Sequence, residues 1–180
     1  MGSLAPIDAA LFKRSLAQWP SGVTVISTRH EGTVYGMTAS SFTSLSLDPP
    51  LVLVAVDHRA RLHHFLPLAR RYGVSVLAQG QAPLSAHFAG RPQEGLPIPW
   101  VESEGLPLLE GAVAQLVCEI DAELPGGDHT IYVGRITHAA AWPEREPLLH
   151  QAGKYRSFAP LPPAAVPSAP AAAPAKAKPD

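Results

Sequence analysis

Three stretches of the chain carry hydrophobic residues at the spacing of a helix. The first begins after Asp8, which can cap it, and ends at Pro20. The second covers Arg59 to Tyr72 and is broken by Gly73, and a short third helix covers Ala82 to Ala89. One apolar face of the first helix is formed by Leu11, Phe12, Leu16 and Trp19.

Extended patterns occupy most of the remaining chain. Leu51 to Val56 is a continuous apolar run of strand length, which suits a buried strand. Prolines and glycines mark a long excursion from Gly90 to Leu109, and loops of this length are usually functional or mobile. The other predicted strands cover 23–27, 33–42, 74–78, 112–124 and 130–142.

These elements predict a mainly β fold with flanking helices. Helices do not regularly separate the strands, so a doubly wound parallel sheet does not fit the pattern. Several strands with a leading helix and a few short helices fit a closed antiparallel barrel.

The composition fits one folded domain, which we assign to residues 1–158. The chain has 180 residues, of which 46% are hydrophobic and 16% are charged, enough for a sizeable core. Residues 159–180 hold seven of the twenty prolines and little to bury, which predicts an extended, disordered Pro/Ala-rich tail. Such a tail can recruit a partner, but a solvated tail is the favoured interpretation.

Charge and sequence signals exclude several classes of protein. A net charge of −1 argues against a nucleic-acid binder. No stretch approaches the roughly 20 apolar residues of a membrane span, and the N-terminus lacks the features of a signal peptide. Cys118 is the only cysteine, which excludes an intrachain disulfide. These features predict a cytoplasmic protein.

Several familiar chemistries lack their motifs. There is no GxGxxG, P-loop or GxSxG, which removes the main signals for Rossmann nucleotide binding and for hydrolase chemistry. His63 and His64 are adjacent and His58 lies five residues before His63, so no pair has the helical spacing of metal ligands. We expect no metal site.

The most informative pattern is GMTASSFTSLSLDPP at residues 36–50. Small and hydroxyl side chains occupy positions where a barrel wall prefers branched apolar residues. Small side chains let a flat ring lie close to the backbone, where hydroxyls and amides can hydrogen-bond its polar edge. Ligand binding is slightly favoured over the alternative, a Ser/Thr-rich strand that leads into a loop.

Two shorter clusters add candidate groups. Residues 57–61, DHRAR, open a helix after a buried strand, where a helix N-terminus and two arginines suit a phosphate. On chemistry alone, a solvated, charged helix start is the more common explanation. Residues 126–130, GGDHT, form a tight turn that delivers His129 to the start of a strand.

Six motifs follow one another along the chain: PSGVTVI (20–26), GMTASSFTSLSLDPPLVLV (36–54), HRAR (58–61), SAHFAG (85–90), GDHTIYVGRI (127–136), and PLL (147–149) with GKYR (153–156). In this order they closely resemble the flavin reductase family with an FMN-binding split barrel. Its members are the small reductases of two-component flavin-dependent monooxygenases. The resemblance covers roughly residues 8–158.

The resemblance implies a homodimeric, antiparallel split β-barrel with flavin lying along the TASSF segment. The residues that would contact the isoalloxazine ring or ribityl chain, largely through backbone groups, are Thr38, Ala39, Ser40 and Ser41. Arg59 and Arg61 match basic positions associated with the flavin phosphate. This chain departs from many relatives there, because Ala60 and Leu62 stand where those relatives have Ser and Thr.

The resemblance also assigns residues around the ring. Phe88 matches the aromatic residue of the family's FAG element beside the flavin, and His129 matches the GDH histidine near the nicotinamide. Tyr155 and Arg156 would close the site from the C-terminal side.

The implied reaction is NAD(P)H-dependent reduction of free FMN or FAD, with the reduced flavin passed to a partner monooxygenase. The cofactors carry the chemistry, so His129 would position the nicotinamide without a covalent role. Two alternatives stay open: a split-barrel oxidase or reductase that holds FMN and acts on its own organic substrate, and a non-catalytic flavin- or haem-binding module. The sequence leaves both FMN and FAD open. It also leaves both NADH and NADPH open, because no Rossmann turn is present whose following residue would discriminate the 2′-phosphate.

Overall fold

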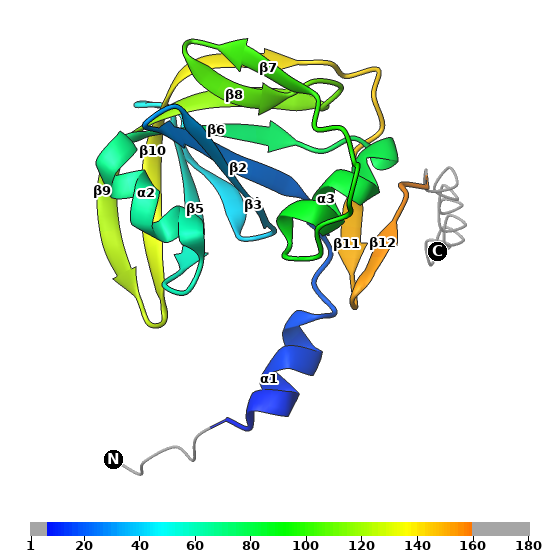
Figure 1. Ribbon diagram of the computed structural model, residues 1–180. Coiled ribbons are helices and arrows are strands. Elements are labelled where there is room, and N and C mark those ends of the chain that lie inside the picture. Colours follow the sequence, from blue (N-terminus) through cyan, green and yellow to red (C-terminus); the bar gives the residue numbers. More distant parts are fainter. Residues whose placement is uncertain (1–6, 160–180) are drawn as a thin grey trace, which may run out of the picture.

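An antiparallel, seven-stranded sheet forms the body of the protein in the computed structural model, which describes residues 7–159 (Figure 1). The strand order is β3-β2-β6-β9-β10-β5-β4. The two edge strands, β3 and β4, are consecutive in the chain and only Ser40 and Ser41 separate them. The sheet therefore curls until its edges meet at these two serines, which is where the barrel is split. The predicted antiparallel split β-barrel is confirmed.

The helices are α1 (Ala9–Leu16), α2 (Arg61–Ala69) and α3 (Ala82–Phe88), with the 3-10 helix η1 (Gln79–Gln81) before α3. The strands are β1 (Ser21–Gly22), β2 (Thr24–His30), β3 (Thr33–Ala39), β4 (Phe42–Ser46), β5 (Leu51–Asp57), β6 (Arg71–Val76), β7 (Trp100–Ser103), β8 (Leu106–Leu109), β9 (Ala114–Gly126), β10 (His129–Ala141), β11 (Leu149–Gln151) and β12 (Lys154–Arg156).

The core lies inside the barrel and reflects the alternation of side chains along a strand. In β5, Val52, Val54 and Val56 are buried while the residues between them are half-buried. They pack with Tyr72 of β6 and Tyr132 of β10, both of which are fully buried. Helix α2 covers one end of this core.

The predicted end of the second helix was wrong. Helix α2 ends at Ala69, and Arg70 adopts a left-handed conformation with φ of 59°. The Arg70 guanidinium donates to the carbonyl of Ile120 at 3.0 Å and pairs with Glu123 at 2.7 Å, both on β9. These contacts turn the chain into β6 at once, so Tyr72 and Gly73 belong to a strand.

Two other predictions were too coarse. The predicted strand at 33–42 is two strands, because the chain crosses the barrel split at Ser40 and Ser41. The excursion from Gly90 to Leu109 contains the hairpin β7–β8, and all four residues of β8 are buried. The pattern also missed β11 and β12; in a small three-stranded sheet, β11 pairs with β1 on one side and with β12 on the other.

Helix α1 begins at the predicted cap, where the carboxylate of Asp8 accepts from the Leu11 amide at 3.0 Å. The helix stands away from the barrel (Figure 1), and none of its residues is buried. The side chains of Leu11, Phe12, Leu16 and Trp19 are exposed. Within residues 7–159, no helix has the length and hydropathy needed to cross a membrane. The predicted tail, residues 159–180, lies outside the described residues except for Ala159.

Candidate active site

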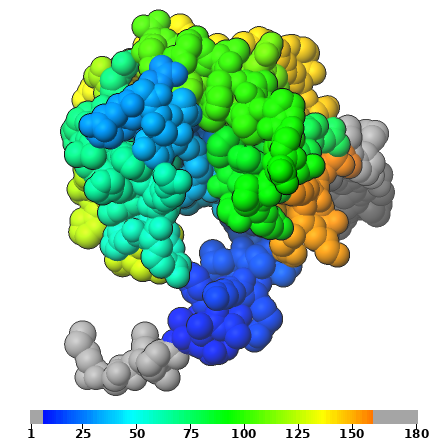
Figure 2. Space-filling view, viewed as in Figure 1, coloured from blue at the N-terminus to red at the C-terminus, as the bar shows by residue number. Residues whose placement is uncertain are grey.

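A groove follows β3 through four adjoining cavities of about 350, 460, 170 and 310 Å³. The first and second share Gly36 and Arg61, and the second and third share Thr38. The third and fourth share Ser40, at the split of the barrel. Figure 2 shows the molecule hollowed between the barrel, α3 and α1. The informative segment of the sequence is therefore one wall of this groove.

The Phe88 ring lies directly against β3 because Gly36 has no side chain. A Cβ on Gly36 would lie 2.8 Å from Cε1 and 2.9 Å from Cδ1 of Phe88. The Phe88 ring, at the end of α3, lies against the strand and also packs on Trp100, with ring centroids 5.5 Å apart. Phe88 lines the first two cavities, as its predicted place beside the ligand requires.

Hydrogen bonds hold the walls of the groove together. The Thr38 hydroxyl donates to the carbonyl of Ser85 at 2.7 Å, and the Tyr155 hydroxyl donates to the Ser85 hydroxyl at 3.0 Å. Strand β3, helix α3 and strand β12 therefore meet at Ser85, which is buried. Tyr155 and Thr38 line the third cavity together.

The remaining residues of the TASSF segment have different surroundings. Ala39 is buried, and its carbonyl accepts from the Thr24 hydroxyl at 2.8 Å. The Ser41 hydroxyl donates to the carbonyl of Ala55 at 2.7 Å, which closes the split onto β5. Ser40 is exposed and lines both the third and fourth cavities. Its hydroxyl has no partner among residues 7–159, so among the TASSF hydroxyls it alone can donate to a ligand, whereas those of Thr38 and Ser41 can only accept from one.

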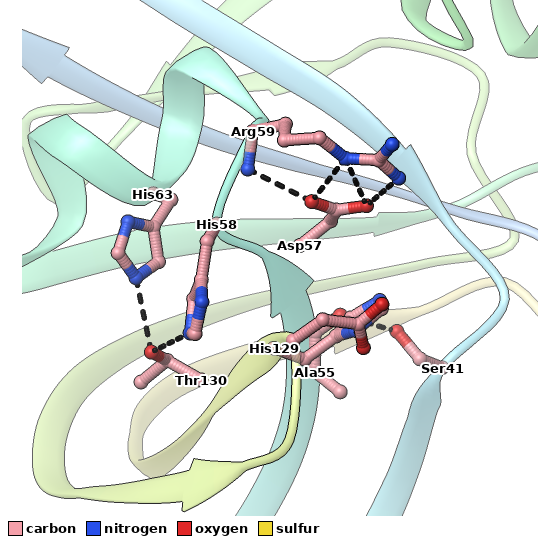
Figure 3. Close-up of polar contacts among 9 residues, drawn as sticks. Ser41, Ala55, Asp57, His58, Arg59, His63, His129 and Thr130 are labelled. Atoms are coloured by element: carbon pink, nitrogen blue, oxygen red, sulfur yellow. Dashed lines mark hydrogen bonds and ion pairs between the residues drawn. The ribbon is translucent and has the colours of Figure 1, made fainter.

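The two arginines of the DHRAR cluster are not equivalent. Arg59 forms an ion pair with Asp57 at 2.6 Å, and its amide also donates to that carboxylate at 2.8 Å (Figure 3). These hydrogen bonds hold the pKa of Asp57 well below its usual range. Arg61 lines the first two cavities, and no described carboxylate pairs with it. Its guanidinium carbon lies 5.5 Å from the ring centroid of Tyr35.

His129 lies outside the four cavities, at the first position of β10. In the strand register, His129 lies opposite Asp57 of β5. Asp57 is two residues from Ala55, whose carbonyl accepts from the Ser41 hydroxyl. Residues two apart in a strand share a face and are about 7 Å apart, so His129 lies near the Ser41 end of the groove. Its Nδ1 is 2.7 Å from a carboxylate oxygen of Asp128, and this contact lowers the pKa of Asp128.

A histidine pair behind this turn was missed by the sequence reasoning, which tested it only as a metal site. Nε2 of His63 and Nε2 of His58 lie 2.9 and 3.3 Å from the hydroxyl of Thr130 (Figure 3). A single hydroxyl can donate to one imidazole and accept from the other. The His58 amide also donates to the carbonyl of Asp128 at 3.1 Å, so the turn that carries His129 is tied to the segment between β5 and α2.

The structure places six of the ten predicted site residues along the groove and leaves four outside its cavities. Those that line the groove are Thr38, Ser40, Ser41, Arg61, Phe88 and Tyr155. The four that line none of its cavities are Ala39, which is buried, Arg59, His129 and Arg156, although His129 is near one end. Groove residues that the sequence did not single out are Trp19, Tyr35, Arg91 and His150.

Burial makes the thiol of Cys118 unreactive. Cys118 is fully buried in β9, and burial raises its pKa to about 12. A protonated, enclosed thiol is a poor nucleophile. A small split barrel with an open groove of small residues and a cationic side chain fits the class of enzymes in which a bound aromatic cofactor does the chemistry.

Comparisons with known proteins agree with this class. Residues 16–159 match the model of the flavin reductase like domain. The chain is 43% identical to an NADH-dependent flavin reductase of Rhodococcus sp, over 87% of this chain and 91% of that protein. It is 45% identical to the reductase component of the Thermus thermophilus 4-hydroxyphenylacetate 3-monooxygenase, over 81% of this chain and 93% of that protein.

A solved structure extends the similarity to the fold. It is the NADH:FAD oxidoreductase SgcE6 of Streptomyces globisporus in complex with NAD and FAD fragments, with a TM-score of 0.79 and 40% identity. The match covers 89% of this chain and 98% of that one. The chain belongs to the flavin reductase like family. The family and the enzyme class predicted from the six motifs, a flavin reductase, are confirmed.

Proposed function

We propose that this protein is the reductase component of a two-component monooxygenase, which uses NADH to reduce free flavin and releases it to an oxygenase. The groove beside β3 carries this proposal, because it combines a wall of small residues with an unpaired arginine. The names of the similar proteins support NADH as the donor and an oxygenase as the partner. We further propose that it acts in the cytoplasm, where reduced nicotinamide is available.

In this proposal the flavin ring lies along residues 38–41. Strand β3 is an edge of the sheet, so backbone N–H and C=O groups on its free side can bond the ring. The Ser40 hydroxyl adds a side-chain bond, whereas the hydroxyls of Thr38 and Ser41 already hold the walls in place. Phe88 and Tyr155 close the groove over the ligand, and Arg156 lies next to Tyr155 in β12.

The flavin accepts a hydride from the nicotinamide, so the protein supplies alignment of the two rings. We assign His129 to positioning the nicotinamide at the Ser41 end of the groove. Asp128 orients its imidazole through Nδ1, and the bond from the His58 amide to Asp128 fixes the turn. His129 has no covalent role.

Replacing His129 by alanine is expected to raise the KM for NADH roughly fivefold, a loss of about 1 kcal/mol, while the KM for flavin stays near wild type. Steady-state kinetics with NADH varied at saturating flavin measures this. His138→Ala is the matched control, since His138 lies exposed on the same strand. Unchanged NADH kinetics in His129→Ala would remove His129 from the site.

The two arginine variants separate the roles of Arg59 and Arg61 at the same net charge. Arg61→Ala is expected to raise the flavin KM roughly fivefold, because it removes a charge-assisted contact to the phosphate. Arg59→Ala should leave the flavin KM within about twofold and instead raise the pKa of Asp57, whose stabilising pair is lost. Kinetics and a carbon-13 NMR titration of the carboxylate measure both effects.

The lowered pKa of Asp57 makes the stability of the folded protein depend on pH. The stabilisation from this pair is present above the unfolded pKa, about 4, and is lost as the pH falls through the folded value. Arg59→Ala should abolish that loss. Equal effects of the two arginine variants on flavin binding would contradict the assignment.

We also propose that the protein is a homodimer joined in part through α1. The apolar face of this helix is exposed, and Trp19 beyond it is 75% exposed. An exposed apolar helix face is typical of a surface that packs against another protein chain. Leu16 and Trp19 also line the fourth cavity. Sedimentation should give twice the chain mass of 19.0 kDa.

The first experiment is NADH oxidation by the purified chain with added FMN or FAD under air. Rapid oxidation that saturates with flavin is the expected result. No oxidation, with a yellow protein that keeps its flavin through gel filtration, would favour a split-barrel oxidase with its own substrate. A protein that neither reduces nor retains flavin would contradict the proposed function.

A further inference from the structure

Side chains join the turn that carries His129 to the first turn of the helix that carries Arg61 (Figure 3). Thr130 lies at the start of β10, and its hydroxyl is 2.9 Å from Nε2 of His63 and 3.3 Å from Nε2 of His58. These two histidines stand on either side of Arg61 in the chain, and we call residues 58–63 the α2 start. In the proposed function Arg61 binds the flavin phosphate and His129 positions the nicotinamide. One hydroxyl therefore connects the elements that hold the two substrates.

Two more hydrogen bonds reinforce this connection. The His58 amide donates to the carbonyl of Asp128 at 3.1 Å, and the Tyr132 hydroxyl donates to the carbonyl of His63 at 3.3 Å. Three alternate residues of the turn and β10, at positions 128, 130 and 132, thus contact the α2 start. Since His129 lies between the first two of them, its position relative to α2 depends on these contacts.

The α2 start has no cap of its own. Its N-cap residue is Ala60, whose side chain cannot accept a hydrogen bond from the amides of the first turn. Leu62 and Leu66 bury one face of the helix in the core, but they make no polar contact. Strand β10 does not need the hydroxyl for its own pairing, because the backbone of Thr130 already pairs with Val56. The hydroxyl therefore serves the α2 start rather than the strand.

Hydride transfer is sensitive to the relative position of the two substrates. The reacting atoms must approach to roughly 3–3.5 Å, and a misplacement of about 1 Å can slow a reaction on the order of 100-fold. If the connection were broken, the α2 start and the turn would shift independently of one another. Each substrate would keep its own contacts, so the rate would fall while both affinities stayed nearly the same.

We propose that Thr130, His58 and His63 form a positioning unit that sets the placement of the flavin phosphate site relative to the nicotinamide site. None of the three lines the groove, so they act through Arg61 and His129. The single hydroxyl donates to one imidazole and accepts from the other, so its removal leaves both without this partner. This inference rests on the proposed function and deepens it by naming the residues that align the substrates.

The test measures flavin reduction in a single turnover of the full chain, without oxygen and with NADH and flavin both saturating. Thr130→Val removes the hydroxyl but keeps the shape of the side chain, and it should lower this rate roughly fivefold while both KM values stay within about twofold. Thr130→Ser keeps the hydroxyl and should recover most of the rate. Thr137→Val is the matched control, because the Thr137 hydroxyl, on the same strand, donates to the carbonyl of Val117 and not to the α2 start.

A second variant reaches the same unit from α2 and covers the case in which Thr130→Val does not fold. His63→Phe keeps a ring but loses the nitrogen that contacts Thr130, so it should also lower the rate with little change in either KM value. The double variant should be no slower than the slower single variant, because residues that act as one unit are not additive. A fall in stability alone would not produce this pattern.

Three outcomes would overturn the inference: an unchanged rate in Thr130→Val, an equal loss of rate in Thr130→Ser, or additive losses in the double variant. In each of these the wild-type chain still reduces flavin with NADH, so the proposed function stands and only the positioning unit is removed. A wild-type chain that reduces no flavin would overturn the proposed function itself, and the inference with it.

Discussion

Replacing Gly36 by alanine is expected to raise the KM for flavin at least tenfold, which corresponds to about 1.4 kcal/mol of binding free energy. The new Cβ would lie 2.8 Å from the Phe88 ring, closer than carbon atoms approach one another. The ring can move only into the groove or with α3. Because Thr38 ties α3 to β3 through the Ser85 carbonyl, movement of the ring into the groove is favoured.

The melting temperature of Gly36→Ala should change little. The alanine lowers the conformational entropy of the unfolded chain, which offsets part of the cost of displacing one ring at the surface of the groove. Steady-state kinetics with varied flavin and thermal unfolding together separate binding from folding. A large fall in melting temperature would show that Phe88 cannot move and that the groove is part of the rigid core.

Gly80→Ala is the matched control. Gly80 lies in η1, and a Cβ there meets nothing within 4 Å. This variant makes the same chemical change without filling space, so the flavin KM should stay at the wild-type value. If Gly36→Ala behaves like Gly80→Ala, the flavin does not lie against this part of β3.

The barrel was predictable because its strands carry their burial in the local sequence. The run from Leu51 to Val56 became β5 within a residue at its end, since alternate side chains face a core that only apolar groups can fill. The end of α2 was not predictable. Apolar spacing continues to Tyr72, and the helix stops early because Arg70 finds partners on β9, a segment fifty residues away.

One part of the candidate site was likewise predictable from the sequence, and another part was not. The small residues 38–41 are contiguous, so a local pattern revealed the wall of the groove. The unequal roles of Arg59 and Arg61 depend on which of the two side chains pairs with Asp57, and the sequence places both arginines at the start of one helix. Tyr35 and Phe65 are thirty residues apart and meet only after α2 packs on β3, so no motif announces their stack.

Replacing Gly134 by alanine is expected to destabilise the protein by about 3 kcal/mol, because it overfills a closed core. Gly134 is buried in β10, and its Cβ would overlap the Tyr72 hydroxyl and lie 2.6 Å from Cζ of Tyr72 and 2.9 Å from Cβ of Cys118. Tyr72 is fully buried, so its ring has no free space to enter. Thermal unfolding should show a fall of about 6–12 °C in melting temperature.

Removing the Tyr72 hydroxyl tests whether contact with Tyr72 causes the destabilisation of Gly134→Ala. It lies beside the Cys118 thiol and makes no hydrogen bond of ordinary geometry with the described residues, so Tyr72→Phe should be close to neutral or stabilising. Since the hydroxyl is the atom nearest to the added methyl group, Tyr72→Phe should restore part of the stability lost in Gly134→Ala. Additive effects of the two substitutions on stability would mean that the added methyl group does not clash with the Tyr72 hydroxyl and that the strand moves instead. Gly80→Ala again sets the baseline, because the same methyl group is added there in open space.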